Sequence, residues 1–340
     1  MNSASPRLHP VIDAPSTGRI VMVFTGGTIA MRIDPTLGGA VPALDAQGIL
    51  DRTRGLNEIA DIEIIDWGRV PATHITFTQI IELAGILEQS LRRPDIDGAV
   101  LVQGTDNIEE TSYALDLLLD SPKPVVVVGA MRNADEDGYE GPVNIRDAAR
   151  CAISPELVGQ GVLVVMAGEV HAADDVTKVS PSAYAAFQSP NFGPLGWIDA
   201  GSLTVRRGRT VAHRIKTTHA VEPIPLIRTH VGIDGTLVRL AHAHGARGFV
   251  IEGAGTGNTP SDLLAACTDA MAAGIPVVMT SRCLTGRARP AYAFPGGSVT
   301  WRNAGAIFAE YLSGLKARIA LSFGLGAGMD VEALAGFFGR

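Results

Sequence analysis

Short apolar runs rich in Val and Ile alternate with longer helical patterns along most of the chain. The runs predict strands over 20–24, 62–65, 98–103, 124–128 and 161–166, and the stretches between them predict helices over 78–92, 109–119 and 143–152. The runs are apolar at every position and do not alternate with polar residues, so both faces of the sheet are expected to be covered. This pattern is typical of parallel strands joined by crossover helices, and it predicts an α/β fold.

The same alternation returns in the second half of the chain. There it predicts strands over 226–233, 246–255 and 274–282, with helices over 259–273 and 300–313. Before it, the segment 216–225 carries two prolines and no apolar period, which indicates a linker. We therefore expect a larger N-terminal domain with a mostly parallel sheet and a smaller C-terminal domain with a parallel sheet. The predicted limits are an extension at 1–18, expected to be flexible, then domains at 19–215 and 226–340 on either side of the linker.

Composition narrows the choice of partners. The net charge is −7 and the 28 Lys and Arg residues are scattered, so no basic stripe is available for a nucleic acid. The chain contains no 18-residue apolar stretch, and its first residues lack the apolar run of a secretory signal. We expect a cytoplasmic protein that binds a small molecule, without a nucleic acid or a membrane as partner.

Metal and disulfide sites are not favoured by the sequence. The three cysteines, Cys151, Cys267 and Cys283, are too widely spaced for such a site and are expected to be buried free thiols. His242 and His244 would share one face of a strand, but no third ligand lies near them in the sequence. The charged segment 206–214 is expected to be a solvated hairpin.

Two glycine turns follow predicted strands and carry hydroxyl groups. The first reads TGGTIA at 25–30 and contains Thr28, and the second reads QGTDNIEET at 103–111 and contains Thr105 and Asp106. Glycines let the backbone turn sharply and approach a ligand closely. The alternative for both turns is an ordinary helix start, with threonine caps and acidic residues that complement the helix dipole. Neither turn has the GxGxxG pattern of dinucleotide-binding proteins.

Lys178 follows a later strand, in the sequence DDVTK at 174–178. Its ordinary interpretation is a surface salt bridge with a neighbouring carboxylate. A buried lysine, in contrast, gives up its proton more readily and could accept one from a threonine hydroxyl. Because ligands of parallel sheets bind at the carboxyl ends of the strands, we expect Lys178 and the two glycine turns to face one region.

These segments together resemble the bacterial-type asparaginase and glutaminase family. The resemblance rests on TGGTIA at 25–30 and GTDNIEET at 104–111, and it extends through the segments around Ala130 and Lys178 to VIEGAGTGN in the second domain. It implies an amidohydrolase that uses a threonine nucleophile, forms an acyl-enzyme and needs no cofactor or metal.

The resemblance also implies roles for individual residues. Thr28 matches the first nucleophile, and Thr105, Lys178 and Asp106 match the second hydroxyl, the buried base and the carboxylate that holds the substrate amine. The carbonyl of Ala130 and the turn at Gly104 would contact the substrate, and backbone N–H groups of the glycine turns would form an oxyanion hole. Asn258 matches a residue that reaches the active site of a neighbouring subunit, which implies a homotetramer or dimer with shared sites.

The chain departs from the family pattern around the substrate amine. Ala40 stands where a loop tyrosine is usual, and Gln103 stands where histidine is usual. The triplet that usually binds the substrate's α-carboxylate and amine aligns with Ala72, Thr73 and His74, and the segment 284–297 lacks the usual glutamate.

An unpaired buried ammonium would be costly, so recognition of a free amino acid is expected to be weakened or rebuilt. One hypothesis is that Tyr292 or Arg287 enters the site and recognises a modified amide, and the alternative is that Tyr292 only packs at an interface. The sequence thus predicts an enzyme acting on asparagine or a related amide. The alternatives are an amidase for a modified or amine-free amide and an inactive amide sensor, and the presence of both threonines and Lys178 disfavours the sensor.

Overall fold

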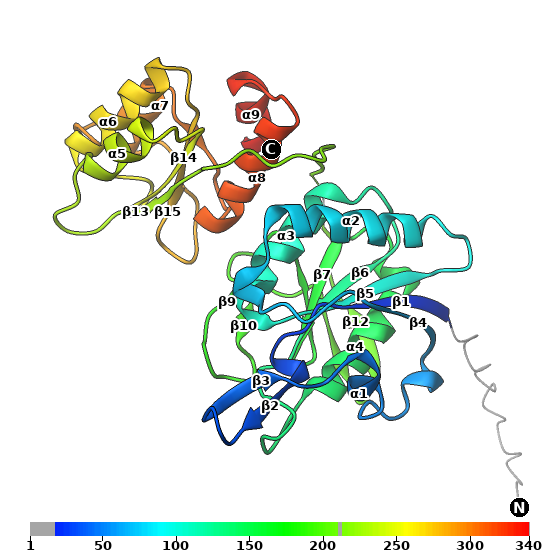
Figure 1. Cartoon of the computed structure of the whole chain (residues 1–340). Helices are drawn as coiled ribbons and strands as arrows, with labels where there is room; N and C mark the ends of the chain where they lie inside the picture. Colours follow the sequence, from blue (N-terminus) through cyan, green and yellow to red (C-terminus); the bar gives the residue numbers. More distant parts are fainter. Residues whose placement is uncertain (1–17, 210–212, 340) are drawn as a thin grey trace, which may run out of the picture.

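The computed structural model describes residues 18–209 and 213–339, which form two sheets with helices packed around them (Figure 1). The extension predicted at 1–18 lies outside these residues except for Gly18, which begins the first strand. In Figure 1 the larger sheet belongs to the blue-to-green part of the chain and the smaller one to the yellow-green-to-orange part.

The larger sheet has eight strands in the order β12-β11-β8-β7-β6-β5-β1-β4. Strands β4, β1, β5, β6 and β7 are parallel, and β8, β11 and β12 continue the sheet with antiparallel pairs. Their bounds are β1 Gly18–Phe24, β4 Ala60–Asp66, β5 Gly98–Val102, β6 Val125–Val128, β7 Val162–Met166, β8 Glu169–Ala172, β11 Gly196–Asp199 and β12 Ser202–Val205. Every residue of β5, β6 and β7 is buried, as continuous apolarity predicts for strands covered on both faces.

Helices and two small hairpins complete this part of the chain. The helices are α1 Ala46–Leu50, α2 Phe77–Leu91, α3 Ile108–Leu118 and α4 Gly141–Ala152, and the hairpins are β2 Met31–Asp34 with β3 Gly39–Pro42 and β9 Thr177–Lys178 with β10 Phe187–Gln188. Helix α2 starts at a capping box, in which Thr76 and Gln79 satisfy each other's backbone N–H groups. The three helices expected in this half are confirmed to within two residues at each end, as are its five strands.

The smaller sheet is parallel throughout, in the order β13-β14-β15-β16. Its strands are β13 Leu226–Arg228, β14 Phe249–Gly253, β15 Val277–Ser281 and β16 Ile307–Phe308, and the helices around it are α5 Thr236–Ala243, α6 Ser261–Ala272, α7 Ser298–Asn303, α8 Gly314–Gly326 and α9 Val331–Phe338. The predicted class, α/β with a large mostly parallel sheet and a smaller parallel one, is confirmed. The limits of the two domains remain a prediction.

Several local predictions were wrong. The strand expected over 226–233 ends at Arg228. The helix expected over 300–313 ends at Asn303, because the chain turns at Gly305, with φ at 102°, and enters β16. His242 lies in helix α5, and the ring of His244 bonds to the carbonyl of Leu240 one turn earlier, so these two residues are not on a strand. Cys283 is exposed and free, whereas Cys151 and Cys267 are buried and free as expected.

The last two helices pack against the first domain as well as the second. Helix α8 contacts α3 of the first domain and strands β14 and β15 of the second (Figure 1). The rings of Phe323 in α8 and Phe77 in α2 lie 5.3 Å apart, edge to face. Phe323, Phe337 and Phe338 belong to the same buried cluster as β1 and β5. The C-terminal helices therefore complete the core around the larger sheet.

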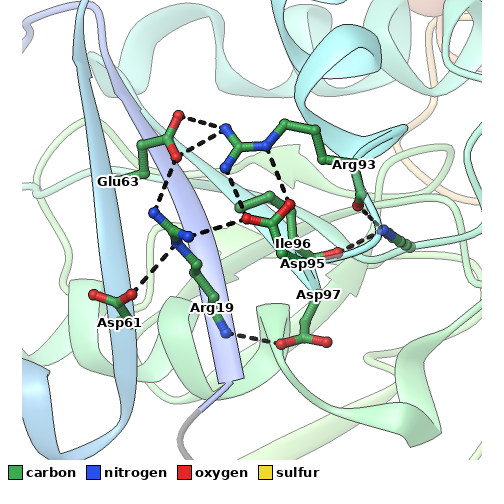
Figure 2. Close-up of polar contacts among 8 residues, drawn as sticks. Arg19, Asp61, Glu63, Arg93, Asp95, Ile96 and Asp97 are labelled. Atoms are coloured by element: carbon green, nitrogen blue, oxygen red, sulfur yellow. Dashed lines mark hydrogen bonds and ion pairs between the residues drawn. The ribbon is translucent and has the colours of Figure 1, made fainter.

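A network of exposed ion pairs lies at the amino ends of β1 and β4, away from the strand ends where ligands bind (Figure 2). Arg19 pairs with Asp61, Glu63 and Asp95. Arg93 pairs with Glu63 and with Asp95, each at 2.8 Å. The hydrogen bond from Arg93 holds the pKa of Asp95 below its usual value. Beside them, the ammonium of Lys123 donates to the carbonyls of Arg93 and Ile96.

A second ion-pair cluster is buried. The Arg209 guanidinium makes two hydrogen bonds of 2.9 Å to Asp116 and one of 3.1 Å to Asp174. The side chains of Arg209 and Asp116 are 5% and 1% exposed. The solvated hairpin expected over 206–214 is therefore wrong at Arg209, which two carboxylates from other segments hold inside the protein; residues 210–212 lie outside the described residues.

Asp116→Ala is expected to lower the free energy of unfolding by about 3–5 kcal/mol, because it leaves the buried Arg209 charge without its main partner. Urea unfolding followed by circular dichroism measures this change. The matched control is Asp61→Ala, which removes an exposed partner of Arg19 and should have a much smaller effect. Equal losses for the two variants would contradict the assignment of stability to the buried pair.

Candidate active site

The two glycine turns meet backbone to backbone at the carboxyl ends of neighbouring strands. Strands β1 and β5 pair in parallel, and Gly27 follows the first as Gly104 follows the second. A Cβ atom on Gly27 would lie 2.2 Å from the Cα of Gly104, and Gly27 also has φ at 98°. Only glycine meets both conditions, since side chains do not fit at this separation and rarely adopt positive φ.

This contact places Thr28 and Thr105 on neighbouring turns. Thr28 begins the short 3-10 helix η1, Thr28–Ala30, and Thr105 begins η4, Thr105–Asn107, which leads directly into α3. Thr105 is buried, with 4% of its surface exposed, and Thr28 is partly exposed. Both hydroxyl-bearing residues therefore lie at the edge of the sheet where the sequence predicts the site.

Lys178 joins this region from strand β9. Its ammonium donates to the Thr105 hydroxyl oxygen at 3.0 Å and to the Asp106 carboxylate at 2.7 Å. The Lys178 side chain is only 14% exposed. The partners of Lys178 are thus more than 70 positions away in the chain. The Lys178 side chain is largely buried, as a catalytic role for it requires.

The carboxylates beside Lys178 in the sequence have other partners. Asp174 bonds to Arg209, and Asp175 accepts hydrogen bonds from the backbone of Asn191 and Phe192. The local salt bridge that the sequence DDVTK offers as an alternative is therefore not formed with these two residues.

A loop that follows β6 holds the Thr28 turn from the other side. The Tyr139 hydroxyl donates to the carbonyl of Ile29 at 2.9 Å, and the amide of Ala134 donates to the carbonyl of Met31 at 3.2 Å. Asp135 accepts 2.9 Å hydrogen bonds from the amide of Ile33 and from Arg32. Burial raises the pKa of Tyr139 to about 12, so its hydroxyl remains a donor at neutral pH.

Tyr139 is a residue of this region that was not among the predicted site residues. Its signal is present in the sequence as an aromatic residue between glycines, DGYEG at 137–141, soon after a predicted strand end. The same loop begins with Ala130, which is buried directly after β6.

The triplet Ala72, Thr73 and His74 lies against the second glycine turn. It forms the 3-10 helix η3, which packs on η4, and Ala72 lies so close to Gly104 that a Cβ there would be 3.0 Å from the Ala72 methyl. Ala72 is buried, and Thr73 and His74 are exposed.

Two further departures from the family pattern are Ala40 and Gln103. Ala40 is exposed on the β2–β3 hairpin. Gln103 is buried and donates to the Thr111 hydroxyl at 3.0 Å.

The predicted site residues of the second domain have local partners. Asn258 accepts a hydrogen bond from the amide of Ser298 at 3.1 Å. Tyr292 is 51% exposed and lies against Phe294, with ring centroids 6.1 Å apart. Arg287 pairs with Glu310 at 2.6 Å. The structure thus brings together Thr28, Gly104, Thr105, Asp106, Lys178 and Ala72, while Asn258 and Tyr292 remain predictions for an assembly of several chains.

Comparison with known proteins identifies the family. Residues 19–211 match the family described as Asparaginase, N-terminal, and residues 224–338 match the Glutaminase/Asparaginase C-terminal domain. The chain belongs to the asparaginase family. It is an amidohydrolase, and the resemblance inferred from TGGTIA and GTDNIEET is confirmed.

Relatives of this asparaginase-family enzyme match over most of its length. It is 34% identical over 335 residues to a probable L-asparaginase of Deinococcus radiodurans, covering 93% of this chain and 96% of that protein. It is 30% identical over 304 residues to an L-asparaginase of Bacillus licheniformis, covering 89% and 94%. A crystal structure of a probable cytoplasmic L-asparaginase from Campylobacter jejuni superposes with a TM-score of 0.87 at 28% identity, covering 95% of this chain and all of that one.

A component of a different kind of enzyme is also similar. One of the polypeptides of the glutamyl-tRNA(Gln) amidotransferase of Archaeoglobus fulgidus is 33% identical over 298 residues, covering 83% of this chain and 69% of that protein.

Among residues 18–209 and 213–339, no group of three His, Cys, Asp or Glu side chains is arranged to hold a metal ion. Within the same residues, every helix is too short or too polar to span a bilayer.

Gly27→Ala is expected to abolish measurable amide hydrolysis and to lower the melting temperature, because the new methyl would collide with the Gly104 backbone. Gly38→Ala is the matched control, since Gly38 also has positive φ, at 67°, but open space around its Cβ. That variant carries only the backbone cost of about 1–2 kcal/mol and should retain activity. Similar activities for the two variants would contradict a requirement for close contact between the turns.

Proposed function

We propose that this enzyme releases ammonia from the side-chain amide of asparagine or a closely related amide, with Thr28 as the nucleophile. The observation that carries the proposal is the contact of the largely buried Lys178 with Thr105, which is buried, and with Asp106, which is exposed, beside the Thr28 turn. A lysine in hydrogen-bond contact with a threonine hydroxyl is the arrangement needed to move a proton during nucleophilic attack.

The proposed reaction proceeds in two halves. The Thr28 oxygen adds to the amide carbon, its proton passes to the leaving nitrogen, and the C–N bond breaks to give ammonia and a threonine ester. Water then adds to the ester carbon and passes a proton through the Thr105 hydroxyl to Lys178, which accepts it as the neutral amine. The C–O bond to Thr28 breaks, that proton returns to the Thr28 oxygen, and the acid product leaves. Asp106 holds Lys178 in place and offers a negative charge to a substrate amine.

Backbone groups supply the remaining contacts in this proposal. The N–H groups of the glycine turns, Gly104 among them, stabilise the oxyanion, and the carbonyl of Ala130 accepts a hydrogen bond from the substrate amide. Loss of one oxyanion donor typically lowers kcat by about 10² to 10³. Thr73 and His74 line the entrance, since they are exposed on a segment that packs against the Gly104 turn.

Assembly is part of the proposal. Asn258 and Tyr292 lie in the second domain and would act on the site of a neighbouring subunit in a cytoplasmic homotetramer or dimer. The exposed aromatic pair of Tyr292 and Phe294 supports an interface there, because such rings are often buried between subunits. The Campylobacter jejuni protein named as cytoplasmic supports the location.

A substrate other than free asparagine is the second candidate. The departures at Ala40, Thr73 and His74 remove usual contacts to a free amino acid. Of the two residues suggested as replacements, Arg287 is already paired with Glu310, whereas Tyr292 is half exposed. This difference favours Tyr292 as the residue that contacts an altered substrate.

Ammonia release from L-asparagine, D-asparagine, L-glutamine and a panel of N-substituted or amine-free amides tests the proposal. Thr28→Ala and Lys178→Met should each lower kcat by about 10³-fold or more, as removal of a nucleophile or of the group that accepts the proton of water does. Turnover of L-asparagine that both variants abolish supports the asparaginase, and turnover of an unusual amide alone supports the second candidate. No turnover of any amide would favour an inactive amide sensor.

Tyr292→Phe tests the contribution of the second domain. Loss of one hydrogen bond to substrate should raise KM by about tenfold, equivalent to about 1.4 kcal/mol, with the oligomer unchanged by light scattering. Phe294→Leu, which leaves the Tyr292 hydroxyl intact, is the control. Unchanged turnover in Tyr292→Phe would leave Tyr292 as an interface residue only.

A further inference from the structure

A buried lysine from the last part of the chain contacts the segment that carries Lys178. Lys316 lies in α8, and only 1% of its surface is exposed. Its ammonium donates to the carbonyl of Asp174 at 3.0 Å and to the carbonyl of Val176 at 2.6 Å. Burial lowers the pKa of Lys316 to about 8, and the Glu109 carboxylate is the strongest of the charges that oppose this shift.

Glu109 holds the same segment at its last two residues. The backbone of Lys178 and the side chain of Thr177 lie beside the Glu109 carboxylate, and both favour its charged form and so lower its pKa. Glu109 is 8% exposed and lies in the first turn of α3, directly after the turn of Thr105 and Asp106. Burial raises its pKa, and the positive charge of Lys316 partly offsets that rise.

These two residues hold a segment that has little secondary structure of its own. Strand β9 consists of Thr177 and Lys178 alone, and it pairs only with the two residues of β10. A hairpin this short does not fix a side chain to a fraction of an ångström. The ammonium of Lys316 bonds to the backbone just before Lys178, and the carboxylate of Glu109 lies beside the backbone at Lys178.

Burial of two charged side chains for packing alone would be costly. A buried ion pair is seldom more stable than apolar residues of the same size, because both charges lose their hydration. Apolar residues at these positions could fill the space, but they could not bond to the backbone before Lys178. The groups that Lys316 bonds to and those that lie beside the Glu109 carboxylate all belong to five residues of the chain, 174–178.

We propose that Lys316 and Glu109 are positioning residues that set the contact between the Lys178 ammonium and the Thr105 hydroxyl. Helix α8 of the C-terminal part of the chain thereby takes part in the proton transfer of its own chain. This role differs from that of Asn258 and Tyr292, which would act on a neighbouring subunit. The inference rests on the proposed function, in which Lys178 is the base.

The double variant Glu109→Gln with Lys316→Met tests the proposal, because it removes both charges and leaves neither one buried alone. Glu109→Gln is the second variant, since it is isosteric and keeps Lys316. The matched control is Lys123→Met: Lys123 also donates to two backbone carbonyls, but just before β6, at the amino ends of the parallel strands. Each variant is studied as the full-length assembly, with kcat, KM and melting temperature measured together.

The expected result is a drop in kcat of about 10- to 100-fold in the double variant with KM changed less than about threefold, as for a catalytic group displaced by up to an ångström. Glu109→Gln should show a smaller drop of the same kind. Lys123→Met should lose stability and keep its kcat. A kcat within twofold of wild type in folded double or Glu109→Gln variants would overturn the proposal, and so would an equal drop in Lys123→Met. Lys178→Met, measured alongside, distinguishes a failure of the positioning role of Lys316 and Glu109 from a failure of the proposed function of Lys178. Full activity in that variant would overturn the proposed function itself.

Discussion

The contact between the backbones of Gly27 and Gly104 is the constraint on which the site depends. Parallel pairing of β1 and β5 brings two strand ends together, but the hydroxyl groups of Thr28 and Thr105 can share one substrate only if the turns also touch. The sheet fixes the direction of the two strands. The glycines have no side chains, so nothing holds the two turns apart. The relative position of Thr28 and Thr105 therefore depends on two glycines, which have no side chains of their own.

Charge is distributed around this contact in pairs that are distant in the sequence. The segment 174–178 carries two aspartates and a lysine, and each binds a different part of the chain: Arg209, the backbone at 191–192, and the turn at Thr105. A charged group in a low-dielectric interior needs such a partner, because an unpaired one would be strongly destabilising. The same requirement makes the segment rigid, since groups from several other elements hold it. Rigidity at Lys178 is thus a consequence of satisfying buried charges.

The sequence was sufficient to predict features that depend on neighbouring residues and insufficient for those that depend on distant ones. Continuous apolar runs located β5, β6 and β7, because a strand that is buried on both faces is apolar at every position. The turn residues Thr28 and Thr105 could be inferred from glycines at strand ends. Lys316 could not, because its partner lies 140 positions away. The sequence marks Tyr139 as an aromatic residue between glycines, but its contact with Ile29, 110 positions away, could not be inferred. The helix expected over 300–313 failed since periodicity does not show where a glycine ends a helix and a short strand begins.

Three of the departures from the family pattern lie in a different environment from the residues proposed to transfer protons. Ala40, Thr73 and His74 are exposed, whereas Thr105 is buried and Lys178 nearly so. A substitution at an exposed position changes what the entrance can bind at little cost in stability, because the surrounding packing does not depend on it. A substitution in the buried group would leave a charge or hydroxyl without a partner. Ala72 and Gln103 are the buried departures; the Gln103 amide nitrogen donates to Thr111, but its Oε1 has no partner among the described residues. Substrate preference in this chain could therefore diverge while the proton-transfer apparatus stayed intact.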